Sequence, residues 1–140
     1  MSKHPQLFTL PIRVYFQDTD AGGVVYHGSY LNYMERSRTE WMRSFGSDCA
    51  GLITELGMGF VVRSVKLDYL KPALLDDLLD VSTQILGLGR SRVTLRQTVF
   101  RGEDTLVDAE LNMVCVTLEN FKPVSVPDEL REQWKPLVTE

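Results

Sequence analysis

The sequence predicts an α+β domain in which one long central helix is wrapped by a curved antiparallel β-sheet. Only one long segment, from about residue 28 or 29 to residue 45, has helical periodicity, and its apolar face carries Tyr30, Met34, Ser37, Trp41 and Phe45. After residue 60, segments rich in β-branched residues alternate in polarity and are joined by short turns. This pattern is typical of an antiparallel meander that covers the apolar face of the helix.

The elements are expected in the order strand, loop, helix and sheet. Residues 8–16 alternate imperfectly and predict a first strand, in which Pro11 indicates an edge or a bend. A loop at 18–27 leads into the long helix, with Ser29 as its expected N-cap. The remaining expected elements are a short helix at 49–56, strands at 60–70, 78–86, 91–100 and 106–118, and a short helix at 127–138.

The bulk properties indicate a single domain, 1–140, with a polar tail at 1–7. The 140 residues carry a net charge of −4 and a pI near 5.2, which disfavours nucleic acid or an anionic membrane as a general partner. No apolar run is long enough to span a membrane and no leader pattern precedes the domain, so we expect a cytoplasmic protein. The two histidines and two cysteines form no ligand cluster, so neither a metal nor a cofactor is expected.

The predicted architecture leaves a sheet edge without a partner. One sheet around one helix has two edge strands, and an unpaired edge is a template for pairing with another chain. We therefore expect at least a homodimer.

The segment from Asp18 to Tyr30 concentrates the residues that can do chemistry. A helix start presents unpaired backbone amides and a partial positive charge, which can stabilise the oxyanion that forms from a carbonyl group. The amides at His27 and Gly28 are the candidates for this role. Asp20, seven residues before His27, could attack the polarised carbon or activate water, and the His27 side chain could assist.

The same residues also permit a purely structural interpretation. Aspartates before glycines are common in turns, because their side chains accept hydrogen bonds from nearby backbone amides. Asp18 is the better candidate for such a structural role. Glu35, on the helix, is a weaker alternative catalytic carboxylate because its helical angle points away from the apolar stripe.

The segment Phe16-Gln-Asp-Thr-Asp-Ala-Gly-Gly-Val-Val-Tyr-His-Gly-Ser-Tyr resembles the active-site motif of the hotdog-fold thioesterases. The similarity is greatest to the 4-hydroxybenzoyl-CoA thioesterase family, within it to the acyl-CoA thioesterases associated with the Tol-Pal system. It covers nearly the whole chain, including residues 30–41 and 65–73. The resemblance implies a hotdog fold, a homodimer or homotetramer, and hydrolysis of an acyl-CoA thioester without a cofactor.

Site roles also follow from this resemblance. The catalytic carboxylate of the family matches Asp20, as nucleophile or general base, and the oxyanion donor matches the amide near His27. Arg90 and Ser91 lie at a turn that contacts the nucleotide part of CoA in the family; Arg92, Arg96 and Arg101 are weaker candidates. The branch often has Tyr where this chain has Phe16, so a mechanism assisted by that hydroxyl is not expected here.

Other functions remain open from the sequence alone. Acyl carrier protein could replace CoA as the thiol carrier. Hotdog proteins also catalyse hydration or dehydration of acyl-CoA, although the seven-residue step from Asp20 to His27 favours hydrolysis. A third possibility is a binding protein of the envelope or of lipid synthesis with weak hydrolysis.

Overall fold

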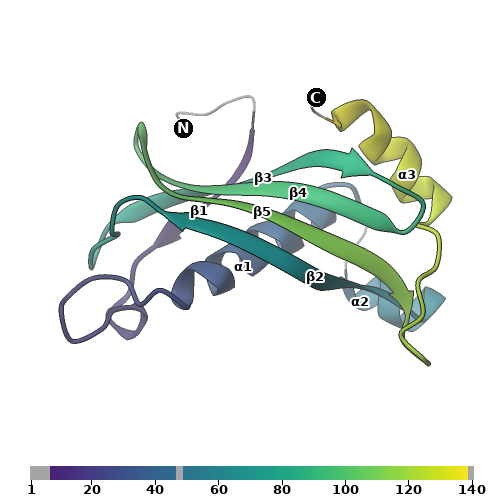
Figure 1. Ribbon diagram of the computed structural model, residues 1–140, viewed down its shortest axis with the longest axis horizontal. Helices are drawn as coiled ribbons and strands as arrows, with labels where there is room; N and C mark the ends of the chain where they lie inside the picture. Colours follow the sequence, from purple (N-terminus) through teal and green to yellow (C-terminus); the bar gives the residue numbers. More distant parts are fainter. Residues whose placement is uncertain (1–6, 47–48, 139–140) are drawn as a thin grey trace.

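The computed structural model describes residues 7–46 and 49–138 and confirms the α+β hotdog architecture. A five-stranded antiparallel sheet with strand order β1-β3-β4-β5-β2 curves around the long helix α1 (Ser29–Arg43), as Figure 1 shows. The sheet and α1 therefore form two layers, with the apolar core between them.

The strands confirm the predicted meander. The sheet consists of β1 (Phe8–Arg13), β2 (Met58–Tyr69), β3 (Leu78–Leu88), β4 (Arg92–Arg101) and β5 (Asp104–Thr117). β3, β4 and β5 pair in sequence, β1 pairs with β3, and β2 pairs with β5. The two edges of the sheet are therefore β1 and β2.

The first strand is shorter than predicted. It ends at Arg13, and the amide of Val14 then donates to the carbonyl of Asp77, 2.9 Å away, in the β2–β3 loop. A 3-10 turn, η1 (Phe16–Asp18), follows. The alternating pattern runs on to Phe16, but contact with a distant loop ends the strand, and the pattern does not reveal that contact.

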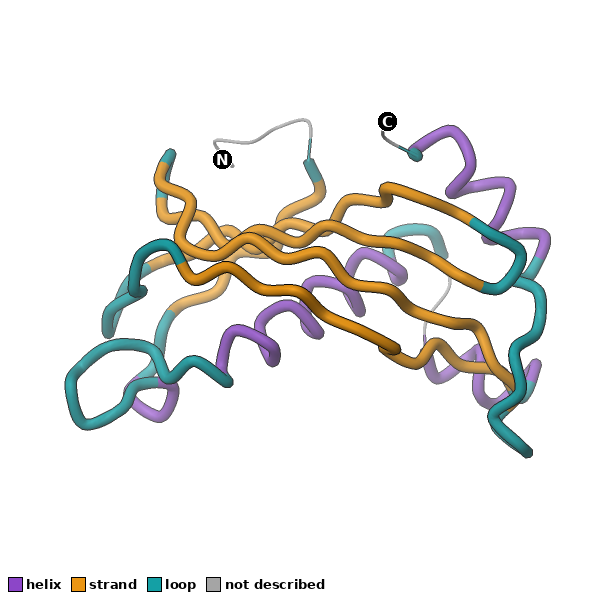
Figure 2. Tube along the Cα trace, viewed as in Figure 1, coloured by secondary structure: helices purple, strands orange, loops and turns teal. Residues whose placement is uncertain are grey.

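The helices agree with expectation except at their ends (Figure 2). α1 buries Tyr30, Tyr33, Met34, Ser37, Trp41 and Met42. Gly28 is its N-cap, so the prediction of Ser29 was wrong: the Ser29 hydroxyl instead donates to the Asp18 carbonyl at 3.3 Å. The short helix at 49–56 is α2 (Cys49–Gly51) with a π-helical turn, η2 (Leu52–Leu56), and the C-terminal one is α3 (Asp128–Trp134) with η3 (Lys135–Leu137).

A buried polar network ties α1 to the middle of the sheet. The Ser37 hydroxyl donates to the Val81 carbonyl on β3 and lies 2.8 Å from the Thr83 hydroxyl. The Gln97 amide nitrogen on β4 donates to Thr83 at 2.8 Å and to the Met34 carbonyl at 2.9 Å. Since buried polar groups are costly unless paired, this network favours one position of the helix on the sheet.

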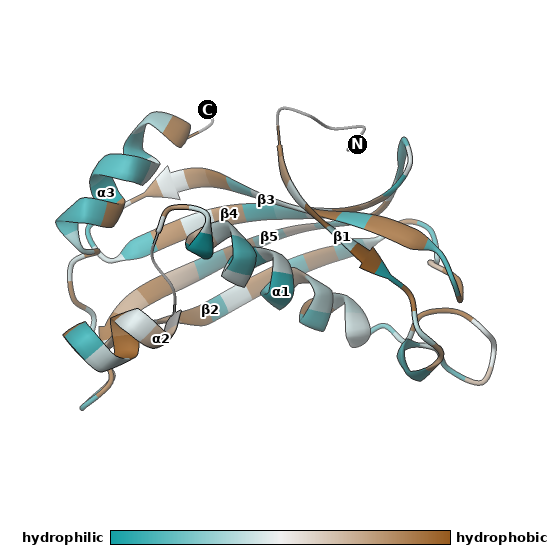
Figure 3. Ribbon diagram, turned by 180° about the vertical axis from the view of Figure 1, so that it is seen from behind, coloured by the Kyte–Doolittle hydropathy of each residue, from teal (hydrophilic) through white to brown (hydrophobic). Residues whose placement is uncertain are grey.

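The two edge strands differ in how well they resist pairing with another chain. β1 contains Pro11, which cannot donate a backbone hydrogen bond. β2 is 12 residues long and leaves Val61, Val62, Val65 and Tyr69 between 38% and 49% exposed. The outward side of α1 is mostly hydrophilic (Figure 3). The exposed apolar side chains near the β2 edge of the sheet therefore come from β2 and not from α1. In the described ranges, no helix is long and apolar enough to cross a membrane.

Candidate active site

The loop between β1 and α1 folds back on itself as a narrow hairpin. The Asp20 amide donates to the Val24 carbonyl at 2.9 Å, and the Tyr26 amide donates to the Asp18 carbonyl at 2.8 Å. Gly23 adopts φ 83°, a left-handed conformation that favours glycine. The hairpin brings the two ends of the loop together immediately before the first turn of α1.

Asp18 connects the two ends of this loop, which confirms the structural role expected for it. Its carboxylate accepts a hydrogen bond from the Tyr15 amide at 2.9 Å, and its carbonyl accepts from Tyr26 and Ser29. Burial, and then the nearby Asp18 carboxylate, raise the pKa of Tyr33, whose hydroxyl makes no hydrogen bond within the described ranges. The Tyr33 hydroxyl therefore stays protonated beside the base of the loop.

Asp20 is exposed at the turn of the hairpin. Its Oδ1 accepts a hydrogen bond from the Gly22 amide at 2.8 Å, which is the turn chemistry that the sequence allowed. This bond orients the carboxylate but does not bury it, so water can reach it. The structural and catalytic interpretations of Asp20 are therefore compatible.

The start of α1 presents two backbone amides. Between the described residues, no hydrogen bond is made by the amide of His27 or Gly28, whereas the next amide, Ser29, donates to the Tyr26 carbonyl. A Cβ atom at Gly28 would lie 2.8 Å from the Tyr26 ring, so this ring needs a glycine beside it. The His27 ring is exposed and lies 4.3 Å from the Tyr26 ring, centroid to centroid.

A pocket of about 290 Å³ opens beside this helix start. It is lined by Val25, His27, Tyr30, Tyr69, Leu70, Lys71 and Pro72. The Tyr69 hydroxyl, at the end of β2, donates to the His27 carbonyl at 3.1 Å. The Tyr30 hydroxyl accepts from the Ala73 amide at 3.0 Å, and burial is the main cause that raises its pKa. The end of β2 and the loop that follows it are thus each hydrogen-bonded to the start of α1, and these bonds fix one wall of the pocket.

Sequence reasoning did not identify Tyr69 or Lys71 as part of this site. Both lie in the 65–73 segment that supported the family resemblance, but no motif within that segment marks them as pocket residues. Tyr69 is the last residue of β2, and only the pairing of β2 with β5 brings it next to the helix start.

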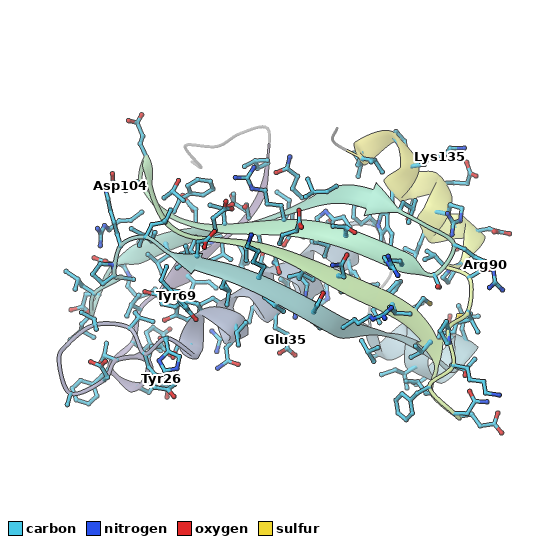
Figure 4. The ribbon with its side chains drawn as sticks, viewed as in Figure 1. Tyr26, Glu35, Tyr69, Arg90, Asp104 and Lys135 are labelled. Carbon is cyan, nitrogen blue, oxygen red and sulfur yellow. The ribbon has the colours of Figure 1, made fainter. Side chains whose placement is uncertain are left out.

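Arg90 and Ser91 lie far from Asp20 and His27 within one chain. They occupy the β3–β4 turn, at the opposite end of the sheet from Tyr26 and Tyr69 (Figure 4). Because β3 has 11 residues, the two ends are separated by about 35 Å. The carbonyl of Arg90 accepts hydrogen bonds from the Val126 amide and the Arg131 guanidinium, while the Arg90 side chain is exposed.

Two of the weaker arginine candidates, Arg96 and Arg101, bind carboxylates of this chain. Arg96 forms two hydrogen bonds of 3.0 Å to the Asp108 carboxylate on the neighbouring strand. Arg101 donates to Asp77 at 2.7 Å. In residues 7–46 and 49–138, no three His, Cys, Asp or Glu side chains gather closely enough to hold a metal ion.

Comparisons with known proteins agree with this architecture. Residues 22–107 match the family model of the Thioesterase superfamily, a range that includes His27 and Arg90 and begins two residues after Asp20. The acyl-CoA thioesterase YbgC of Haemophilus influenzae is 40% identical over 89% of this chain and 91% of its own length. The long-chain acyl-CoA thioesterase FadM of Escherichia coli K12 is 30% identical over 81% of this chain and 86% of its own length.

A solved structure supports the same conclusion. The crystal structure of a probable thioesterase from Bartonella henselae superposes with a TM-score of 0.83 at 35% identity, covering 86% of this chain and 99% of that one.

Proposed function

This chain belongs to the Thioesterase superfamily, and we propose that it hydrolyses the thioester bond of acyl-CoA to a free acid and CoA. The observation that carries the proposal is the pair of backbone amides at His27 and Gly28, which make no hydrogen bond to any described residue at the start of α1. The loop that leads into this helix start also carries an exposed carboxylate, Asp20, and an exposed imidazole, His27.

The proposed reaction uses these groups as follows. The thioester carbonyl oxygen accepts hydrogen bonds from the two amides, which stabilise the negative charge that develops on it. Asp20 either attacks the carbonyl carbon, forming an anhydride that water then opens, or removes a proton from the attacking water. In both routes the carbon–sulfur bond breaks, the thiolate of CoA takes up a proton, and the acyl group leaves as a carboxylate.

His27 has two proposed contributions. Its amide serves as one oxyanion donor. The Tyr69 hydroxyl donates to the His27 carbonyl, which shares a peptide plane with the amide of Gly28, the second donor, and so helps to hold that amide in place. Its imidazole, packed against Tyr26, is exposed and can exchange protons with the leaving thiolate or the incoming water.

We further propose that the active unit is a homodimer formed through β2. Two copies of β2 paired antiparallel about the strand centre would bury the exposed Val62, Val65 and Tyr69 side chains. A twofold axis at that centre turns the sheet end for end. The partner subunit's Arg90 and Ser91 would then lie at the end that carries Asp20 and His27, where they could bind the phosphates of CoA. Two such dimers could assemble further into a tetramer.

Thiol release tests the proposal directly. We expect wild type to release CoA from one or more of acetyl-, butyryl-, hexanoyl-, palmitoyl-, malonyl- and benzoyl-CoA, detected with a chromogenic disulfide. Asp20→Asn should lose at least about a hundredfold in kcat. Glu35→Gln is the matched control, because it neutralises the alternative carboxylate, which lines a different cavity on α1, and should keep activity.

Three outcomes would contradict parts of the proposal. Full activity of a folded Asp20→Asn variant would remove Asp20 from the mechanism. Loss in Glu35→Gln alone would transfer the role to the helix carboxylate. If CoA esters are inert but acyl carrier protein thioesters are hydrolysed, the carrier assignment is wrong and the chemistry stands.

A further inference from the structure

The loop that follows β5 holds an exposed phenylalanine in a fixed conformation. The Phe121 amide donates to the Thr117 carbonyl at 2.7 Å, and the Thr117 amide donates to the Lys122 carbonyl at 3.0 Å. The side-chain oxygen of Asn120 accepts a hydrogen bond from the Lys122 amide at 3.2 Å. Phe121 is 64% exposed and has φ 56°. Bulky residues rarely adopt this left-handed conformation, and such residues cluster where the protein holds a ligand or a switch.

This loop lies at the open edge of the sheet. Thr117, the last residue of β5, is paired with Met58, the first residue of β2. The Leu118 amide donates to the Gly57 carbonyl at 2.9 Å. Figures 1 and 3 show the loop after β5 projecting beyond the end of the sheet on the side of β2. Phe121 is therefore exposed beside the edge that the proposed dimer uses.

Pairing of β2 with its copy brings this loop to the candidate active site of the other subunit. In the antiparallel arrangement about the strand centre, the Met58 end of one β2 lies opposite the Tyr69 end of the other. The residues after Tyr69 line the pocket at the helix start, and one of them, Leu70, is 58% exposed. The partner subunit's Phe121 and this pocket wall thus lie at the same end of the combined sheet of the two subunits.

Strand order determines what lies between the pocket and the proposed phosphate site. From the pocket outward, the partner subunit contributes β2, then β5 with its loop, then β4 with the turn that carries Arg90 and Ser91. Neighbouring strands are about 4.8 Å apart, so three steps from one subunit's β2 to the partner subunit's β4 span about 14 Å. The loop with the partner subunit's Phe121 lies within this span.

The pantetheine arm of CoA has the length to cross the same span. About 13 bonds join its sulfur to the first phosphorus, and at roughly 1.25 Å for each bond the extended arm measures about 16 Å. An arm that starts at a thioester near His27 and ends at the partner subunit's Arg90 therefore passes the partner subunit's Phe121. The arm contains methylene and methyl groups, whose burial against an aromatic ring is favourable. Because hydrogen bonds already order the loop, binding loses little conformational freedom there.

We propose that Phe121 acts in trans: the partner subunit's Phe121 packs against the pantetheine arm of a substrate whose thioester lies at the first subunit's helix start. The inference rests on the proposed thioesterase function and its β2 dimer. It assigns a specificity-determining role, selection for pantetheine-linked thioesters, to a residue that takes no part in bond cleavage. The same contact serves CoA and acyl carrier protein, because both present their acyl groups on this arm.

A series of three thioesters tests the contact, each made with the acyl group that the wild type hydrolyses fastest. The CoA ester carries the arm and the nucleotide, the pantetheine ester carries the arm alone, and the N-acetylcysteamine ester lacks most of the arm. Phe121→Asn removes the ring and introduces a residue that tolerates the left-handed conformation. It should lower kcat/KM at least about tenfold for the first two esters and less than about twofold for the third. Phe121→Tyr, which keeps the ring, should retain wild-type values.

Inhibition gives a second readout that does not depend on turnover of the shortest ester. S-methylpantetheine contains the arm but has no thioester to hydrolyse. Its inhibition constant against the CoA ester should be at least about fivefold higher for Phe121→Asn than for wild type. Equal inhibition constants would contradict a contact between the ring and the arm.

Mixed dimers test whether the contact is made in trans. When Asp20→Asn and Phe121→Asn subunits are refolded together, each heterodimer has one site that combines Asp20 of one subunit with Phe121 of the other. Activity on the CoA ester should rise at least about threefold above the average of the two unmixed proteins. Absence of a gain, with heterodimers present, would place Phe121 in the same site as its own Asp20 and overturn the proposal.

Leu78→Asn is the matched control, because it removes an exposed apolar side chain (52%) from β3, three positions from β2 in the sheet. It should leave all three esters unaffected, and light scattering verifies that each variant remains a dimer. An equal loss on the three esters in Phe121→Asn, a loss confined to the CoA ester, or a similar loss in Leu78→Asn would each overturn the role of Phe121 while leaving the thioesterase function intact. Absence of wild-type turnover on every ester would instead overturn the proposed function, and this inference with it.

Discussion

Gly28→Ala is the change for which the structure makes the sharpest prediction. The backbone at Gly28 has φ −71° and ψ −22°, which alanine adopts without strain. The added Cβ, however, would lie 2.8 Å from one carbon of the Tyr26 ring and 3.2 Å from a second. Because carbon atoms pack at about 3.5–4.0 Å, the ring has to move by roughly 0.7 Å or more.

The displaced ring would disturb the proposed oxyanion site. Tyr26 lies 4.3 Å from the His27 ring, so its movement changes the position of His27 and of the two amides at the helix start. A misplacement near 1 Å can reduce turnover by about a hundredfold, so we expect kcat to fall roughly 10- to 100-fold. Folding stability should change by less than about 1 kcal/mol, because only the N-cap residue is altered.

A double-mutant cycle tests whether the contact with Tyr26 is the cause. kcat and KM are measured by thiol release for wild type, Gly28→Ala, Tyr26→Ala and the double variant. If the ring transmits the effect, Gly28→Ala should cost less than about threefold when Tyr26 is absent, and each tenfold of coupling equals 1.36 kcal/mol. The same loss of kcat in both backgrounds would refute the reasoning and would point to the methyl group blocking the substrate itself.

Three other predictions concern the assembly, the core and the surface. Val65→Arg places a charge on the inner face of β2 and should give a folded monomer with little turnover; a fully active monomer in light scattering and thiol-release assays would contradict the shared site. Gln97→Leu leaves the partners of its buried amide unpaired and should lower the free energy of unfolding by about 2–3 kcal/mol, measured by urea denaturation. Hydrogen bonds from Arg96 hold the pKa of Asp108 below its ordinary value, so its stabilisation is present above about pH 4 and is lost as the pH falls through the lowered pKa. The stability difference between wild type and Asp108→Asn should therefore be about 1 kcal/mol or less at pH 7 and shrink in acid; a difference that grows in acid would reverse this assignment.

Local patterns were sufficient wherever a short stretch of chain decides the structure. The period of the buried positions in α1 and the alternation in β3, β4 and β5 each reflect one face packed against the core, so both could be read from the sequence. The structural role of Asp18 was predictable for a similar reason, because its carboxylate bonds an amide only three residues away.

Predictions failed where distant segments compete for the same groups. Ser29 has the residue type of an N-cap, but its hydroxyl is used by the Asp18 carbonyl, 11 residues earlier in the chain. The first strand stops at Arg13 because the β2–β3 loop pairs with Val14. Neither competitor lies within the window in which a helix or strand pattern is judged.

The sequence by itself determined the α+β class, the single long helix, the meander and a loop that carries candidate residues for thioester chemistry, because each depends on residue type and short-range spacing. Only the tertiary structure decided that β2 is the open edge, that Tyr69 meets His27, and that Arg90 lies at the far end of the sheet from Asp20. The physical reason is that strand order and register bring together residues 40 or more positions apart. The spacing of residue types along the sequence does not show which of these distant surfaces pack against one another.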